Sequence, residues 1–248
     1  MSLINPQVLY AINQFRTALD TNLGYFVDSV NKNCETNLFS TYNYKLYSLI
    51  SENVRMDINY LVSLNPDYDI FGFPGMQRNI RNSIEAYFDL YNLTYDKNYL
   101  ALMKYISNNA KTDMDEYKHV LHYADVLKIK PTIDKKTNKK HYNFPVTSRV
   151  NIARNTGNTD VANLFTPYIK DANAYVHADV FATPPINKCE RIENLLYIDI
   201  LILYYSFQQL TNFVLHDFHY APTFSLDTEY SSCMTFLNQY KGYSIIQN

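Results

Sequence analysis

Hydrophobic residues recur every three or four positions along most of the chain, which is the spacing of one face of an α-helix. The clearest segment is 73–99, where large apolar side chains share one face and polar ones share a narrow opposite strip. The apolar face consists of Ile80, Ile84, Tyr87, Phe88 and Tyr91, and the strip consists of Arg78, Arg81, Glu85, Asp89 and Asn92. A helix that is mostly apolar around its girth lies deep in a fold. We therefore expect a central helix that begins at Pro74, with its few charges facing a groove or one another.

Two long helices are predicted before this segment. Asn5-Pro6 is typical of a helix start, because proline fits the first helical position, and Asn65-Pro66 is typical of a stop. The first helix is expected to reach about Lys32, and the second to extend from about Leu38 to Leu64. The positions expected to face the core are Leu9, Ile12, Phe15, Leu19 and Leu23 in the first helix, and Tyr42, Leu46, Ile50, Val54, Ile58 and Leu61 in the second.

Shorter helices are predicted in the rest of the chain, from residues that favour helix ends. Asp96, Thr112 and Ser148 are typical N-cap residues, and Gly157 is typical of the position after a helix. Pro167 is expected to end one helix and to begin another. The predicted ranges are 96–108, 112–126, 148–154, 160–167, 168–181, 186–218 and 228–240.

Residues 128–145 interrupt the helical pattern around Pro131 and Pro145 and predict a loop or a small hairpin. This insertion is basic. Its charges either face solvent or contact the phosphates of a nucleic acid, and in the second case the candidates are Lys135, Lys136, Lys139 and Lys140, together with Arg78. The expected fold is all-α: one helical bundle over residues 1–220 that carries this insertion, and a helical appendage over residues 221–248 that packs on it.

Composition narrows the functional classes. The net charge of −2 creates no overall field that would draw the chain to nucleic acid or membrane. The three cysteines are widely spaced and odd in number, and the N-terminus has no signal-peptide pattern, so we expect reduced thiols and a cytoplasmic protein. The most apolar run, from Leu195 to Phe207, contains Asp199 and is too short to span a bilayer. It predicts a buried central helix and no membrane contact.

Lys170, Asn173 and His177 lie on one face of a predicted helix, because their spacings bring them over successive turns. A cation, an amide and an imidazole in one row can bind a phosphate and move a proton, and cleavage of a phosphodiester at neutral pH needs both. The alternative is structural: His177 hydrogen-bonds to a neighbouring carboxylate and holds two helices in register.

Arg81 and Glu85 are four residues apart and can pair with each other, although arginine before glutamate is the weaker order on a helix. Other partners are therefore considered. Glu85 facing His177 would orient the ring and raise its basicity, whereas Arg81 facing it would create an anion site. The structural alternative is an ion-pair network inside the bundle.

No cofactor and no metal is expected. Asp115, His119 and His122 share a helical face, but a third strong ligand for zinc is not evident. The sequence has no Walker loop, no Gly-x-Gly-x-x-Gly, no Gly-x-Ser-x-Gly and no Cys-x-x-Cys. Enzymes of the nucleotide-fold and hydrolase-fold classes are therefore not expected.

Two stretches resemble a known family. Residues 80–90, with Asp96 and Tyr99 after them, resemble the Arg-x-x-x-Glu helix of a bacterial family of helical proteins, here Arg81 and Glu85. Residues 150–157 and then 168–177 resemble a later segment of that family, which here ends at His177. The family is similar to the HEPN superfamily and its abortive-infection relatives.

This resemblance implies a helical bundle, often dimeric, that cleaves RNA without a metal ion in phage defence or toxin systems. Its ribonuclease motif is an arginine, four to six residues, and a histidine. In this chain Lys170 stands at that spacing before His177. His177 would be the general acid or base, Lys170 and Arg81 would hold the phosphate, and Glu85 and Asn173 would orient them.

A non-catalytic function remains the alternative, because lysine lacks the planar fork of the arginine that it replaces. The protein would then be a helical module that binds or senses a protein partner, an antitoxin or a phage component, through an exposed apolar or tyrosine-rich face. RNA and a second copy of the chain are further expected partners.

Overall fold

The computed structural model describes residues 6–63, 72–96, 98–107, 131–133, 140–142, 146–176, 188–222, 224 and 226–239. As predicted, the described chain is all-α, apart from one short hairpin. Its elements are α1 (Pro6–Asn33), η1 (Leu38–Ser40), α2 (Tyr42–Ser63), α3 (Gly72–Tyr95), α4 (Tyr99–Ser107), β1 (Pro131–Ile133), β2 (Lys140–Tyr142), α6 (Val146–Asn155), α7 (Thr159–Val176), α8 (Lys188–Phe218) and α9 (Asp227–Gln239). The helix predicted at 112–126 lies outside the described residues.

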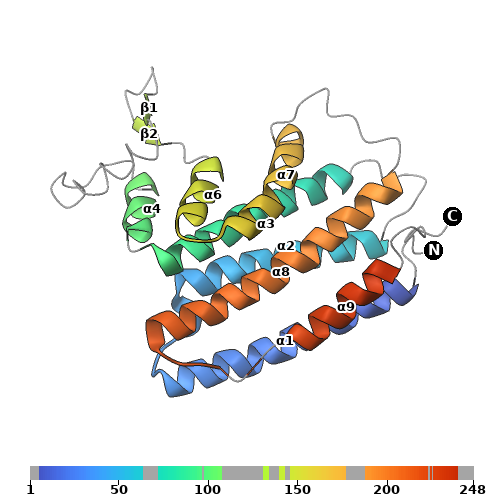
Figure 1. The fold of residues 1–248 in the computed structure, drawn as a ribbon, viewed down its shortest axis with the longest axis horizontal. Coiled ribbons are helices and arrows are strands. Elements are labelled where there is room, and N and C mark those ends of the chain that lie inside the picture. Colours follow the sequence, from blue (N-terminus) through green and yellow to red (C-terminus); the bar gives the residue numbers. More distant parts are fainter. Residues whose placement is uncertain are drawn as a thin grey trace. The chain divides into compact units, whose positions relative to one another are not determined.

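The chain divides into two compact units, one made of residues 1–90 and 167–248 and the other of residues 91–166. In the first unit α1 lies along α9, and α2 lies along α8 (Figure 1). Helix α9 also contacts α8. The boundary predicted between residues 220 and 221 stays a prediction.

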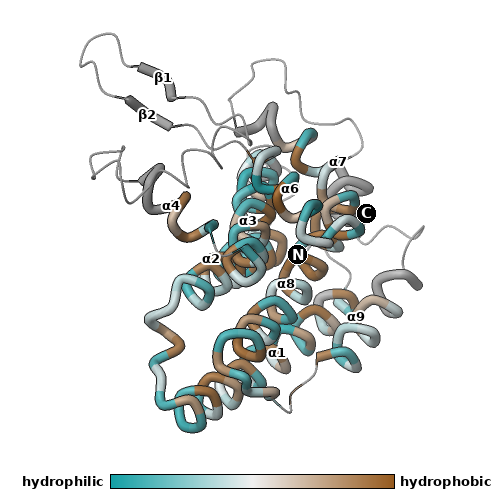
Figure 2. The backbone as a smooth tube through the Cα atoms, turned by 60° about the vertical axis from the view of Figure 1, so that its left-hand side comes forward, coloured by the Kyte–Doolittle hydropathy of each residue, from teal (hydrophilic) through white to brown (hydrophobic). Residues whose placement is uncertain are grey.

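Helix α1 forms because its apolar residues follow the helical repeat, and Figure 2 shows hydrophobic and hydrophilic stretches alternating along it. Ile12, Phe15 and Leu19 are buried, as predicted, whereas Leu23 is only half-buried. The buried face continues through Phe26, whose ring lies 5.6 Å from that of Phe207 on α8, measured between centroids. This ring contact links α1 to α8.

The second predicted helix is divided, because the 3-10 turn η1 precedes α2. Thr41 directly precedes α2, and its hydroxyl accepts a hydrogen bond from the backbone N–H of Tyr44 at 3.2 Å, as an N-cap residue does. The predicted positions Ile50, Val54, Ile58 and Leu61 are all buried.

The prediction for Tyr42 was wrong, since its side chain is 56% exposed, and Leu46 is only half-buried. Asn43 and Tyr47 take the buried positions instead. Steps of four residues rotate by about 40° beyond a full turn, so a face followed in such steps drifts around the helix.

Helix α3 begins at Gly72 and ends at Tyr95, close to the predicted limits. Its predicted apolar face is buried, but the opposite strip is not uniform. Arg78 is exposed, Arg81 and Glu85 are half-buried, and Asp89 and Asn92 are buried. In the second unit, the Asn92 amide donates to the backbone oxygen of Arg149 at 3.0 Å.

Helix α6 ends at the predicted glycine. Gly157 has φ +106°, and the backbone N–H groups of Gly157 and Asn158 donate to the oxygens of Arg154 and Ala153. This pair of bonds is a Schellman motif. Ser148, however, was wrongly predicted as the N-cap: α6 begins at Val146, and Ser148 is buried inside it.

Pro167 does not separate two helices, because α7 continues through it. The prediction of a break at this residue was therefore wrong. Proline removes one backbone N–H from the helical ladder. The turns on either side of Pro167 bury Ala162, Phe165, Ile169 and Ala172, and this packing outweighs the loss of one hydrogen bond.

The insertion at 128–145 contains a two-stranded antiparallel hairpin, in which Pro131, Thr132 and Ile133 pair with Tyr142, His141 and Lys140. The hairpin alternative is thus the one observed. The apolar run that was predicted to form a buried helix lies within α8, where Leu195, Ile198 and Leu203 are buried. Among the described residues, no helix is long and hydrophobic enough to cross a bilayer.

Candidate functional site

The predicted pair Arg81 and Glu85 is present on α3. The Nε and Nη2 atoms of Arg81 donate to the same oxygen of Glu85, Oε1, at 3.0 and 2.8 Å. Their side chains are 12% and 25% exposed, so the pair lies at the edge of the core. Two donors on one acceptor fix the plane of the guanidinium. Of the arrangements considered from the sequence, pairing within the helix is the one observed.

The second predicted group is described only in part. Lys170 is exposed on α7, in the same unit as Arg81. The side chain of Asn173 and the whole of His177 lie outside the described residues. A site in which His177 meets Arg81 therefore stays a prediction.

The predicted nucleic-acid contacts are also described only in part. Arg78 is exposed on α3, and the backbone of Lys140 belongs to β2. Lys135, Lys136 and Lys139 lie outside the described residues. Nothing in the described part of the chain joins these residues into one surface.

Asp115, His119 and His122 also lie outside the described residues. In the part of the chain that the structure covers, no three or more histidine, cysteine, aspartate or glutamate residues gather as metal ligands would. The histidine at the end of α8, His216, contacts Asp217 instead, with Nδ1 and Oδ1 2.8 Å apart.

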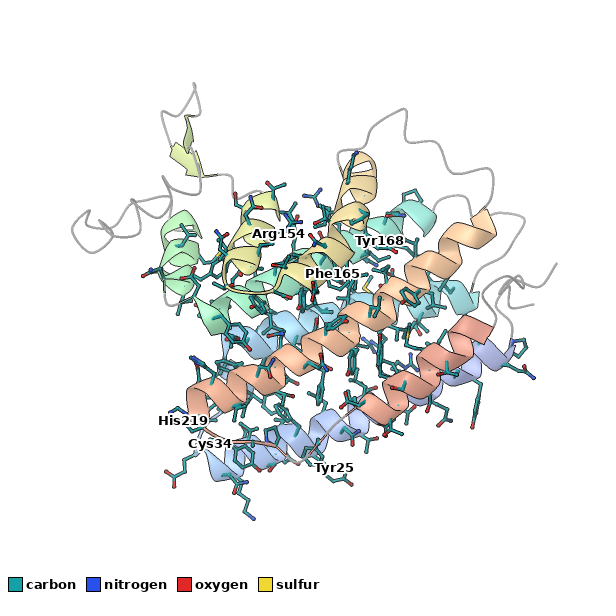
Figure 3. The ribbon with its side chains drawn as sticks, viewed as in Figure 1. Tyr25, Cys34, Arg154, Phe165, Tyr168 and His219 are labelled. Atoms are coloured by element: carbon teal, nitrogen blue, oxygen red, sulfur yellow. The ribbon has the colours of Figure 1, made fainter. Side chains whose placement is uncertain are left out.

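Arg154 lies on α6 (Figure 3). Its Nη2 atom donates to the side-chain oxygens of Asn163 and Thr166 on α7, each at 3.1 Å. These contacts join the two helices across the Gly157 turn. Within the second unit, Arg154 thus has a structural function.

A buried polar seam between α2 and α3 was not predicted. Asn53 donates to the Ser83 hydroxyl at 3.1 Å, and one turn along, Asn79 donates to Asp57 at 2.6 Å. Asn53, Ser83 and Asp57 are less than a tenth exposed. We call these four residues the α2–α3 seam. Their spacing places 53 opposite 83 and 57 opposite 79, as in antiparallel helices.

Asp199 on α8 extends the seam with a second buried carboxyl group. Its side chain is fully buried and lies within hydrogen-bonding reach of the Asp57 carboxyl group. Burial and the charge of neighbouring Asp57 raise the pKa of Asp199 well above its ordinary value. Burial also raises the pKa of Asp57 to about 7, against the opposing effect of the Asn79 hydrogen bond. The pair holds a proton near neutral pH in a place that solvent does not reach.

The sequence carried a signal for this seam. Asn53 and Asp57 directly precede Val54 and Ile58 on the core face of α2, and Asp199 interrupts the most apolar run of the chain. Polar residues on a core face need partners. That rule identifies the residues, but it does not say which helices pair.

The described part of the chain also contains a pocket of about 360 Å³ between α8 and the start of α9. It is lined by Tyr204, Phe207, Gln208, Thr211, Asn212, Phe224, Leu226 and Asp227. At one end the Tyr204 hydroxyl contacts the Asp227 carboxylate and accepts a hydrogen bond from Gln208 at 2.7 Å. None of these residues was predicted from the sequence to form a site.

Comparison of the chain with protein-family models, with curated proteins and with solved structures finds no match.

Proposed function

We propose that the protein is a HEPN-like helical protein of the bacterial phage-defence or toxin type that cleaves RNA in the cytoplasm without a metal ion. The observation that supports this proposal best is the Arg81–Glu85 pair. A guanidinium is held in a fixed plane at the edge of the core, at 12% exposure, by a carboxylate one turn away. An oriented guanidinium is the group that recognises a phosphate.

The proposed reaction is an internal transfer. A base removes the proton from a ribose 2′-hydroxyl, and the 2′-oxygen attacks the adjacent phosphorus. The bond to the 5′-oxygen breaks, the 5′-oxygen takes a proton, and a cyclic phosphate is left. His177 exchanges these protons, Arg81 and Lys170 stabilise the charge on the phosphate, and Glu85 and Asn173 orient them.

The test is RNA cleavage by the purified protein in EDTA. Activity in the wild type should fall by about a hundredfold or more in His177→Ala, and in Arg81→Ala. Arg55→Ala is the matched control, because Arg55 also pairs with a glutamate of its own helix, Glu52, but both are exposed on α2. Equal activity in all four proteins, or cleavage that EDTA abolishes, would refute the proposal.

A second candidate is a non-catalytic module that docks a partner. Three large apolar side chains spaced by seven residues are exposed on α2: Tyr42 at 56%, Leu49 at 47% and Met56 at 52%. We call them the α2 stripe. Apolar residues at heptad spacing form seams between helices.

A second copy of the chain is the partner that fits this stripe best. An antiparallel copy related by a two-fold axis at Leu49 sets Leu49 against itself and Tyr42 against Met56. It also brings Lys45 close to Glu52 of the copy, so the charges at the edge are complementary.

Sedimentation velocity tests this candidate. The wild type should be a dimer, and Leu49→Glu should be a monomer with unchanged helix content. Val62→Glu is the control, since Val62 is an exposed apolar residue of α2 that lies off the stripe. A monomeric wild type, or equal dissociation in both variants, would exclude the dimer. A stable dimer without nuclease activity would favour this candidate over the first.

A further inference from the structure

The pocket between α8 and α9 combines aromatic rings with side-chain amides. Phe207 of α8 and Phe224, which precedes α9, contribute the rings. Gln208 and Asn212 contribute the amides, and their spacing of four residues brings both to the same face of α8. Aromatic rings pack against flat apolar surfaces, whereas amides pair with hydrogen-bonding edges. The pocket therefore has both features that a planar heterocycle requires.

The other polar side chains of the pocket are engaged within the protein. The Tyr204 hydroxyl accepts a hydrogen bond from the Gln208 amide at 2.7 Å and contacts Asp227. Burial and the neighbouring carboxylate raise the pKa of Tyr204, so this hydroxyl keeps its proton and donates it to Asp227. The Thr211 hydroxyl donates to the backbone oxygen of Phe207 at 3.1 Å. Because Asp227 is engaged in this way, we assign it no contact with a ligand.

The Asn212 carboxamide is the group of the pocket that can pair with a ligand. Asn212 is half-buried on α8, and its side chain makes no hydrogen bond within the part of the chain that the structure describes. A carboxamide presents an acceptor and two donors side by side. Because partial burial limits its access to water, a ligand with a complementary edge would gain hydrogen bonds there.

The aromatic side of the pocket is held in place by neighbouring rings. Phe224 stacks on Tyr25 of α1, with centroids 6.3 Å apart and 25° between the ring planes (Figure 3). The centroid of the Phe207 ring lies 5.6 Å from that of Phe26 on α1 and 6.2 Å from that of Tyr47 on α2. Because these rings are already packed, a flat ligand would bind without first ordering them.

We propose that this pocket binds a free, neutral aminopurine of the adenine type, whose edge pairs with the Asn212 carboxamide and whose ring lies against Phe207 and Phe224. An asparagine amide forms two hydrogen bonds with the N6 and N7 edge of adenine, and bases stack on aromatic side chains. The volume of about 360 Å³ is within the range of small-molecule sites. No lysine, arginine or histidine is among the lining residues that the structure describes, so the pocket offers a phosphate no cation, which favours the free base over a nucleotide. This inference does not depend on the proposed function, because the pocket contains none of the residues proposed for RNA cleavage.

Isothermal titration calorimetry of the full chain with three matched purines tests the proposal. Adenine presents a donor beside an acceptor on one edge, 6-dimethylaminopurine lacks the donor, and purine lacks the amino group. Adenine should bind about tenfold more tightly than either of the other two. Equal binding of the three, or no heat with adenine at millimolar concentration, would overturn the proposal.

A short oligonucleotide distinguishes a free base from a base within a strand. Tetradeoxyadenylate has the same bases but no 2′-hydroxyl, so the proposed cleavage cannot consume it. It should not displace adenine from the pocket, because no lining cation in the described part of the chain would meet its phosphates. Displacement of adenine by this oligonucleotide would overturn the assignment to a free base.

Three variants locate the site. Asn212→Leu keeps the size of the side chain but removes the amide, and should weaken adenine binding by about tenfold. Asn13→Leu is the matched control, because Asn13 is also half-buried on a long helix of the same unit but does not line the pocket, and it should leave binding unchanged. Thr211→Phe fills the pocket without altering the amides and should abolish binding. Unchanged affinity in Asn212→Leu, or in Thr211→Phe with the circular dichroism spectrum of the wild type, would overturn the assignment.

Discussion

Asp57 of α2 and Asp199 of α8 place two carboxyl groups side by side in the interior of the first unit, where α2 packs along α8. Two adjacent carboxylates cannot both be ionised at low cost in a dry environment. One proton therefore remains on the pair, and Asp199, the more deeply buried of the two, is the residue that keeps it. Asn79 stabilises the negative charge of Asp57 at the same time.

The pair should make stability depend on pH. Since the pKa of each carboxyl is raised on folding, the folded protein holds protons that the unfolded chain releases above about pH 4. The contribution of these bound protons to the free energy of unfolding is fully present below that pH. It is lost as the pH rises through the folded-state pKa, which is about 7 for Asp57. The free energy of unfolding in urea should fall from pH 5 to pH 8, by up to about 1.4 kcal/mol per unit for each extra proton.

Asp199→Asn isolates this effect. The variant should lose the part of the dependence that the Asp199 proton contributes and keep a smaller fall up to about pH 7, because burial still raises the pKa of Asp57. Asp217→Asn, at an exposed position, should keep the slope of the wild type. A wild-type stability that rises over this range in parallel with Asp199→Asn would contradict the assigned protonation.

Removing one partner of the hydrogen bond between Asn53 and Ser83 should lower the free energy of unfolding more than removing both partners. Ser83→Ala leaves the buried Asn53 amide without its acceptor and should destabilise the protein by about 1–3 kcal/mol. Adding Asn53→Leu removes the polar group as well and should recover part of that loss. A double-mutant cycle in urea measures the coupling, and strictly additive losses would argue against the bond.

The two glycines Gly24 and Gly157 should respond to alanine in opposite directions. Gly157 has φ +106°, where a Cβ atom is strained, so Gly157→Ala should cost about 1–2 kcal/mol. Gly24 lies inside α1, and an added Cβ atom there meets nothing within 4 Å, so Gly24→Ala should stabilise by about 0.5–1 kcal/mol. Thermal unfolding followed by circular dichroism compares them, and a shift of the same sign in both would be inconsistent with these conformations.

The free thiols Cys34 and Cys233 should differ in reactivity. Burial raises the pKa of Cys233 to about 12, whereas Cys34 lies just after α1 and is partly exposed (Figure 3). Because the thiolate is the reactive form, iodoacetamide at pH 8 should modify Cys34 in the native protein and Cys233 only after unfolding. Peptide mass spectrometry reads both sites, and denatured protein is the control. Equal native rates would mean that Cys233 of α9 is not buried against the rest of its unit.

The periodic pattern of the sequence predicted most helices, because each apolar face follows from local spacing. The predictions were wrong where tertiary packing determines which residues are buried or where a helix ends. Tyr42 was assigned to the core of α2 by steps of four residues, and the packed helix buries Tyr47 instead. Pro167 predicted a break that the buried residues on either side of it override.

Only the part of the candidate site that lies within a single helix could be predicted from the sequence. Arg81 and Glu85 are one turn apart, and their pairing needs no other element. The α2–α3 seam and the Asp57–Asp199 pair join residues of three different helices, so the spacing of residues along one helix does not predict them. The pocket depends in the same way on Phe224, which lies between helices and follows no repeat.

The seam also limits how α2 and α3 can align. Its two hydrogen bonds are one turn apart on each helix, and sliding α3 along α2 by one turn, about 5.4 Å, would break both bonds and leave at least two of the four polar groups without a seam partner. Purely apolar side chains at these positions would tolerate such a slip. The four polar residues of the seam therefore fix the register of α3 against α2. Apolar packing alone would allow several registers.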